Sequence, residues 1–260
     1  MVNYGFSLFT FEYFLMILVR VAAFVFIAPF YGMSNTPRRT KAGFSVCVAI
    51  ILYQAVLPRE VLEYSGVIEF AIIILKEGIT GLLIGFAANI CNSIIVFSGK
   101  VIDMEIGLAM ANMYDPTTQT QSGLTGTMYN YFIMLLLIGT DMHHYILRAL
   151  IDTYQLIPVN GAVFDWDHLM GSMAMFVSDL MVLGFRIVLP IFACSMILNC
   201  ILGIMAKVAP QMNMFAVGIQ LKILLGFGIM FLTVTLLPSI ANMIFTEMKR
   251  MIVSVVEGMF

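Results

Sequence analysis

Long apolar runs dominate this chain and limit what it can fold into. The run at residues 6–30 is interrupted by only two charged residues, and a helix of that length crosses about 30 Å of hydrocarbon. Further runs cover residues 67–98, 169–205 and 214–245. Charged residues make up 11% of the sequence, whereas soluble domains contain about 25%. The sequence therefore predicts an all-α integral membrane protein.

Charged residues recur inside these runs. Arg20 lies in the middle of the first run, and Lys76 and Glu77 lie in the second. An unpaired charge in lipid costs a few kcal/mol, so Arg20 faces protein or its helix is not centred in lipid. For Lys76 and Glu77 we favour an ion pair between helices over a proton relay. Because two runs also exceed one bilayer thickness, we expect about six hydrophobic segments folded as bent or broken helical hairpins in an oligomer.

Two glycines in the second run suggest a close helix contact. Gly81 and Gly85 are four residues apart and therefore lie on one face of a helix. Small residues at this spacing let another helix approach closely. We expect a neighbouring helix to pack there.

The segment at residues 103–124, DMEIGLAMANMYDPTTQTQSGL, lies between two apolar runs. It begins with the carboxylates Asp103 and Glu105, continues with methionines, and then reaches a proline that stops a helix. A polar, uncharged loop follows. Such a segment is a poor lipid-facing helix but is suited to lining or closing a path, although ordinary packing explains its methionines equally well. The candidate gating residues are Met110, Met113, Tyr114, Asp115, Pro116, Thr117, Gln119 and Gln121.

A basic cluster follows the first apolar run. Arg38, Arg39 and Lys41 lie close together in a loop that also contains two prolines. Such a cluster marks a cytoplasmic loop by the positive-inside rule. The alternative is a rim that contacts a partner subunit or acidic lipid head groups.

The composition argues against several functions. The formal net charge is -2 and no basic stripe is present, which argues against nucleic-acid binding. We find no arrangement of nucleophile and base and no phosphate loop, so we expect neither an enzyme nor a cofactor. His143 and His144 face different directions on a helix and have no third ligand nearby in sequence, so a metal site is not expected. The four cysteines lie in apolar runs, which predicts free, buried thiols.

Charged, glycine and proline residues occur in a distinctive order along almost the whole chain. They are Arg20, Ala28-Pro29, Pro37, Arg38, Glu77, Gly78, Gly81, Gly85, Gly107, Asp115-Pro116, Asp152-Thr153, Pro158, Gly161, Leu198-Asn199, Gly203, Ala209-Pro210-Gln211, Phe215 and Gly218. In this order and spacing the chain resembles the flagellar biosynthetic protein FliR family and its type III secretion counterparts. Lys207 stands where relatives often carry arginine, which keeps the charge but not the bidentate geometry.

The resemblance implies a non-catalytic subunit of a protein-export gate in the bacterial inner membrane, at the flagellar basal body. It implies a multi-pass chain, with a P-subunit-like part at about 1–190 and a Q-subunit-like part at about 191–260. One copy would complete a helical ring with the P and Q subunits, next to the export-switch B subunit and membrane lipid. Unfolded substrates would pass through the ring, and the segment at 110–123 would plug it at rest.

The expected site residues fall into two further groups. The buried charges or contacts between subunits are Arg20, Arg38, Lys76, Glu77, Asp103, Glu105 and Lys207. The packing and turn residues are Gly81, Gly85, Pro210, Gln211 and Phe215.

Two alternatives remain open at this stage. One is the equivalent subunit of a virulence-type injection apparatus. The other is a secondary transporter that binds ions or protons at Glu77, Glu105 or Asp179. Against the transporter, the sequence contains no convincing internal repeat.

Overall fold

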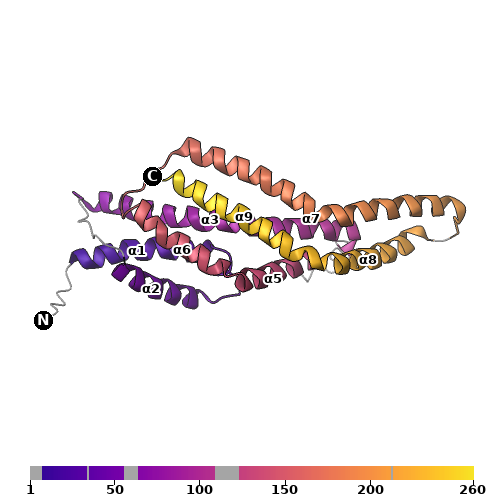
Figure 1. Cartoon of the computed structure of the whole chain (residues 1–260), viewed down its shortest axis with the longest axis horizontal. Coiled ribbons are helices and arrows are strands. Elements are labelled where there is room, and N and C mark those ends of the chain that lie inside the picture. Colours follow the sequence, from indigo (N-terminus) through magenta and orange to yellow (C-terminus); the bar gives the residue numbers. More distant parts are fainter. Residues whose placement is uncertain (1–7, 34, 56–63, 109–122, 212) are drawn as a thin grey trace. The chain divides into compact units, whose positions relative to one another are not determined.

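The computed structural model describes residues 8–33, 35–55, 64–108, 123–211 and 213–260 (Figure 1). These residues form helices and no strand, which confirms the all-α class. The helices are α1 (Leu8–Ile27), α2 (Arg38–Ala55), α3 (Val67–Ile106), α5 (Leu124–Gly139), α6 (Met142–Leu156), α7 (Trp166–Val208), α8 (Met214–Thr233) and α9 (Leu237–Glu257), with a 3-10 turn at Val234–Leu236.

The two longest helices contain the over-long apolar runs. Helix α3 has 40 residues and α7 has 43, so the runs at 67–98 and 169–205 each lie within one helix. Helix α3 contains no proline, and its backbone therefore has no missing donor at which to break. Within the described residues the chain turns instead at shorter segments such as 140–141 and 209–211.

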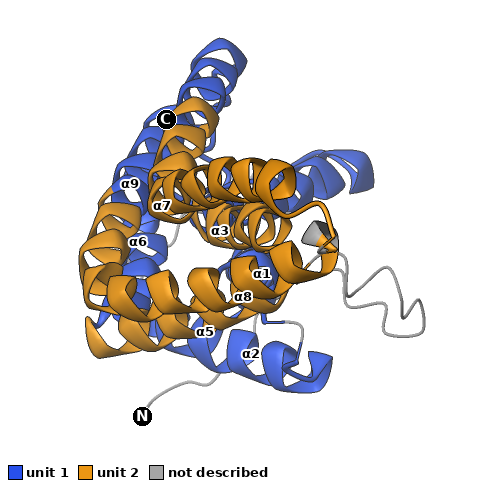
Figure 2. Cartoon of the chain, turned by 90° about the vertical axis from the view of Figure 1, so that its right-hand side faces the viewer, with its two compact units in different colours: residues 1–90, 141–176, 247–260 blue, residues 91–140, 177–246 orange. Residues whose placement is uncertain are grey.

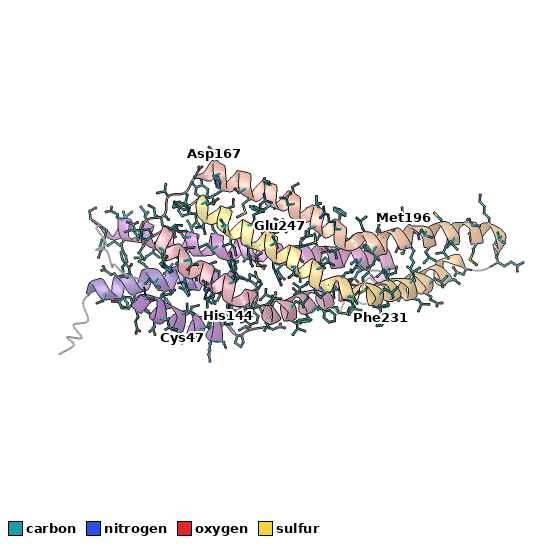
Figure 3. The ribbon with its side chains drawn as sticks, in the orientation of Figure 1. Cys47, His144, Asp167, Met196, Phe231 and Glu247 are labelled. Carbon is teal, nitrogen blue, oxygen red and sulfur yellow. The ribbon has the colours of Figure 1, made fainter. Side chains whose placement is uncertain are left out.

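Three helical stretches in the described part of the chain are long and apolar enough to cross a membrane. They are Thr10–Ile27, Trp166–Val208 and Ala216–Glu257. Large apolar side chains are exposed along the second and third stretches, for example Met196 at 50% and Phe231 at 79% (Figure 3). Apolar surfaces of this kind are covered by lipid or by another protein.

The cysteines follow the same pattern. Cys91 is buried, but Cys47 (Figure 3) and Cys200 are exposed, so the expected burial of all four thiols is wrong. The reason is that an apolar run in a membrane protein carries an outward apolar face as well as an inward one. All four thiols are free.

Each of the two compact units of the chain is assembled from segments far apart in sequence (Figure 2). Unit 1 contains residues 1–90, 141–176 and 247–260, and unit 2 contains residues 91–140 and 177–246. In unit 1, α1 and α2 lie side by side, with Tyr13 and Phe14 of α1 in edge contact with Tyr53 of α2 (Figure 1).

The C-terminal residues close unit 1. The backbone N–H of Val163 donates to the carbonyl of Met259, and the N–H of Asp165 donates to the carbonyl of Gly258. Met259 is fully buried. These bonds attach the end of α9 to the segment that leads into α7.

Candidate functional site

A buried ion pair joins α1 to α3 in unit 1. The Nε of Arg20 lies 2.6 Å from Oε2 of Glu77, and its Nη2 lies 3.1 Å from Oε1. Both side chains are completely shielded from solvent. A planar guanidinium that donates two bonds to one carboxylate is the strong, geometrically specific form of this interaction. Arg20 therefore finds its opposite charge within its own chain.

The turn after α6 completes the environment of this pair. Arg20 also donates from Nη1 to the carbonyl of Ile157 at 3.0 Å, and the N–H of Asn160 donates to Oε1 of Glu77 at 2.9 Å. The ring of Tyr154 lies 4.3 Å from the guanidinium carbon. Asn160 has a φ of 68°, a left-handed conformation that asparagine tolerates. One ion pair thus ties together α1, α3 and the 157–160 turn.

The glycines of α3 allow α1 to come this close. A Cβ atom on Gly81 would collide with the carbonyl oxygen of Arg20, and one on Gly85 would lie 3.0 Å from the carbonyl oxygen of Phe24. Helix α1 therefore packs on the face that the small residues define. The close approach places Arg20 within reach of Glu77, one turn before Gly81.

The other predicted site residues are placed differently. Asp103 is buried, Lys76 and Glu105 are half-buried, and Arg38, Lys207, Pro210 and Gln211 are exposed. Phe215 belongs to α8. The candidate gating residues Met110, Met113, Tyr114, Asp115, Pro116, Thr117, Gln119 and Gln121 lie outside the described residues.

The end of α3 and the start of α5, which precede and follow residues 109–122 in the sequence, contact each other in unit 2. Helix α3 ends at Ile106, and the next residue, Gly107, has a φ of 89°, the left-handed conformation typical of a glycine after a helix. Both carboxylate oxygens of Asp103 lie within 3.3 Å of the backbone nitrogen of Thr125, which donates to them. Gly123 is the residue before α5, and a Cβ atom there would collide with the Asp103 carboxylate. Asp103 therefore supplies an acceptor that α5 lacks at its own start.

Three helices of unit 2 approach the end of α3 at glycines. Gly126 of α5 and Gly99 of α3 are so close that a Cβ atom on either would collide with the backbone of the other helix or press tightly against it. A Cβ on Gly184 of α7 would press on Ile94, and one on Gly226 of α8 would clash with Ile106. Ser98 also donates to the carbonyl of Gly184 at 3.2 Å. The C-terminal part of α3 is therefore tightly packed against α5, α7 and α8.

Burial raises the pKa of Asp103, and the hydrogen bonds from Thr125 oppose that rise. Asp103 lies outside the three stretches that are able to span a membrane. Burial therefore removes solvation from the Asp103 carboxylate, and its hydrogen bonds to Thr125 offset part of that loss.

Asp103→Ala is expected to destabilise the start of α5 by about 0.5–2 kcal/mol, the usual cost of losing a helix cap. Asp103→Asn keeps an acceptor oxygen without a buried charge and should cost less. Hydrogen exchange at the Thr125 amide measures the effect, with faster exchange in the alanine variant. Equal protection of this amide in the wild type and both variants would contradict the capping role.

The fold and this packing define an all-α membrane protein whose helices are held by buried polar contacts and close glycine approaches. The chain belongs to the family described as bacterial export proteins, family 1, whose model matches residues 11–248. The resemblance seen in the sequence is thereby confirmed.

Several relatives that share one name match the chain over most of its length. It is 26% identical over 238 residues to the flagellar biosynthetic protein FliR of Bacillus subtilis (strain 168), covering 91% of each chain. Identity to the protein of that name from Escherichia coli (strain K12) is 21% over 241 residues, covering 92% of this chain and 91% of the relative. For Aquifex aeolicus (strain VF5) it is 27% over 223 residues, covering 84% and 83%.

Proposed function

We propose that this chain is a structural and gating subunit of the flagellar protein-export channel in the bacterial inner membrane, at the basal body. The family match over residues 11–248 carries the proposal, and relatives with a flagellar biosynthetic name match over about nine tenths of their length. Three stretches able to span a membrane agree with this location. The subunit works by packing and movement, without catalysis.

In this proposal the segment at 110–123 plugs the pore at rest. The helices before and after this segment are held together by the Asp103 contact to Thr125 and by tight glycine packing in unit 2. Met104, just before the segment, is 63% exposed. Met104, Met110 and Met113 would form a soft seal, because methionine side chains adapt to changing neighbours.

The chain acts within a larger assembly in this proposal. Its P-like part at about 1–190 and Q-like part at about 191–260 would complete the ring of P and Q subunits, next to the B subunit. The exposed apolar side chains of α7 and α8 would face those subunits or lipid. The exposed Arg38 and Lys207 would contact partners or acidic head groups. Unfolded substrates would pass through the channel in transit.

An ion-coupled transporter is less well supported. Glu77 accepts two bonds from Arg20 and one from the Asn160 backbone, so its carboxylate is already occupied by protein donors. Structural use of this carboxylate leaves little capacity to bind a transported ion. The other alternative, a subunit of a virulence-type injection apparatus, would have the same gating role in a different assembly.

Purification of the tagged chain from a flagellated cell, in mild detergent, tests the proposal. We expect two other membrane subunits to co-purify in a fixed ratio, because the exposed apolar faces of α7 and α8 need a partner. Arg148→Ala, an exposed change on α6, serves as the matched control and should leave the ratio unchanged. A chain that purifies alone and drives ion-dependent uptake in vesicles would overturn the proposal.

A further inference from the structure

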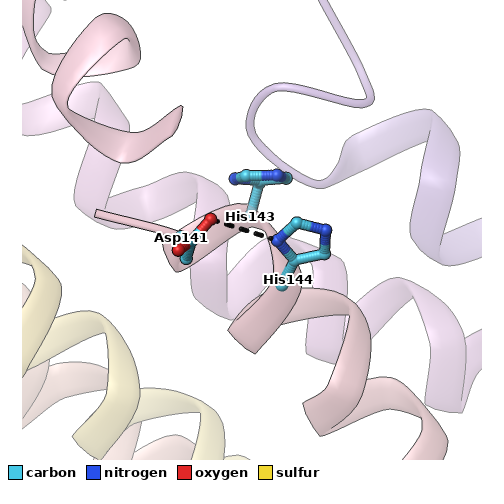
Figure 4. A group of neighbouring side chains, drawn as sticks. All are labelled: Asp141, His143 and His144. Atoms are coloured by element: carbon cyan, nitrogen blue, oxygen red, sulfur yellow. Dashed lines mark ion pairs between the residues drawn. The ribbon is translucent and has the colours of Figure 1, made fainter. Parts of the chain in front are cut away.

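Three side chains of the types that bind metals lie together where α6 begins. They are Asp141, His143 and His144, all in unit 1 (Figure 4). Each offers one ligand atom, and these atoms lie within 4.8 Å of one another. From the sequence a metal site is not expected, because adjacent histidines face different directions on a helix and no third ligand is identified nearby. Asp141, two residues before His143, supplies that ligand.

Asp141 has an unusual conformation for its position. It is the N-cap residue of α6, yet its side chain makes no capping hydrogen bond, and its φ of 57° and ψ of 18° place it in the left-handed region. Aspartate at an N-cap normally accepts a bond from the first turn of the helix. Here Oδ1 lies instead 3.4 Å from Nδ1 of His144 (Figure 4). The carboxylate therefore faces the His144 ring and does not cap the first turn of α6.

His143 contributes an independent observation. Its Nδ1 atom is buried and has no hydrogen-bond partner among the described residues. The ring is positioned by Phe30, at 5.7 Å between ring centroids, and the carbonyl of His143 accepts a bond from the Tyr31 hydroxyl at 2.9 Å. A buried polar atom without a partner costs about 1–3 kcal/mol unless some other group satisfies it.

We propose that Asp141, His143 and His144 bind a divalent transition-metal ion of the zinc class. Two imidazoles and one carboxylate are the donor set that zinc takes at sites with three protein ligands and one open position. Four ligands at about 2.0–2.2 Å from zinc lie roughly 3.3 Å apart, so the three side chains need only small rotations to converge. Asp141 and His144 are 81% and 71% exposed and are free to make them. Magnesium and calcium prefer sites made of oxygen atoms and fit this set poorly.

Cobalt titration of the full-length chain tests the site. The chain is purified with its membrane partners, without a polyhistidine tag, and treated with a chelator first. We expect one Co²⁺ per chain to give visible absorption typical of a low-coordinate nitrogen and oxygen site, and one equivalent of Zn²⁺ to displace it. Asp141→Asn keeps a residue that tolerates the left-handed conformation, and His144→Gln changes an exposed side chain, so both variants should fold.

The chain contains one further histidine, His168, which is exposed and serves as the matched control. Loss of Asp141 or His144 should weaken Co²⁺ binding by at least the roughly 10- to 100-fold that loss of an outer-shell partner costs at metal sites. His168→Gln should leave it unchanged. A wild-type chain without the Co²⁺ spectrum would overturn the proposal. So would binding that survives both ligand variants, or that falls equally in His168→Gln.

Discussion

Arg20→Ala is expected to destabilise the protein by about 3–5 kcal/mol, because it leaves the Glu77 carboxylate buried without its opposite charge. Glu77 has no exposed surface, and among the described residues it keeps the Asn160 N–H as its donor in that variant. Glu77→Ala should cost a similar amount, since it strands the guanidinium instead. The thermal unfolding temperature of the purified protein and its protease resistance in membranes measure the loss.

Two further variants separate the charge from the volume. Arg20→Met combined with Glu77→Leu replaces the pair by apolar side chains, so it should be less destabilising than either alanine variant. Arg20→Lys keeps the charge but loses the bidentate contact and should fall between wild type and alanine. Arg148→Ala, on the exposed face of α6, is the control for simple loss of an arginine. Alanine variants at Arg20 and Glu77 as stable as this control would refute a structural role for the pair.

The buried pair also illustrates what the sequence predicts and what it leaves open. Arg20 and Glu77 stand out as charges inside apolar runs, and Gly81 and Gly85 stand out by their spacing. Their mutual contact was not predictable, because the two charges are 57 residues apart and the helices must pack before they meet. The Ile157 carbonyl and the Asn160 N–H carry no sequence signal except the turn around them.

Asp103 shows the limit of arguments from local spacing. Local spacing alone predicts Lys100, three residues earlier on the same face of α3, as its partner. In the structure Asp103 instead accepts bonds from Thr125, on the far side of the 109–122 segment. This contact depends on how α3 and α5 pack against each other. The contact of Asp141 with His144 is local instead, and it goes with a left-handed backbone at Asp141 that the sequence does not indicate.

Deletion of residues 114–122 should have the largest functional effect, because we propose that the segment at 110–123 seals a pore. This deletion leaves the contact between Asp103 and Thr125 and the packing glycines of unit 2 intact. We therefore expect the export complex to assemble and to leak. Arg148→Ala, an exposed change on α6 outside the named site residues, is the control and should not leak.

Proton and small-ion leakage across the membrane, in cells that express the chain with its partner subunits, is the most direct measurement. Co-purification of the subunits first establishes that the deletion variant assembles. We expect leakage that rises several-fold above wild type and the Arg148→Ala control, because the plug is missing from an assembled pore. Wild-type leakage from a fully assembled deletion complex would contradict it and assign the segment a connecting role.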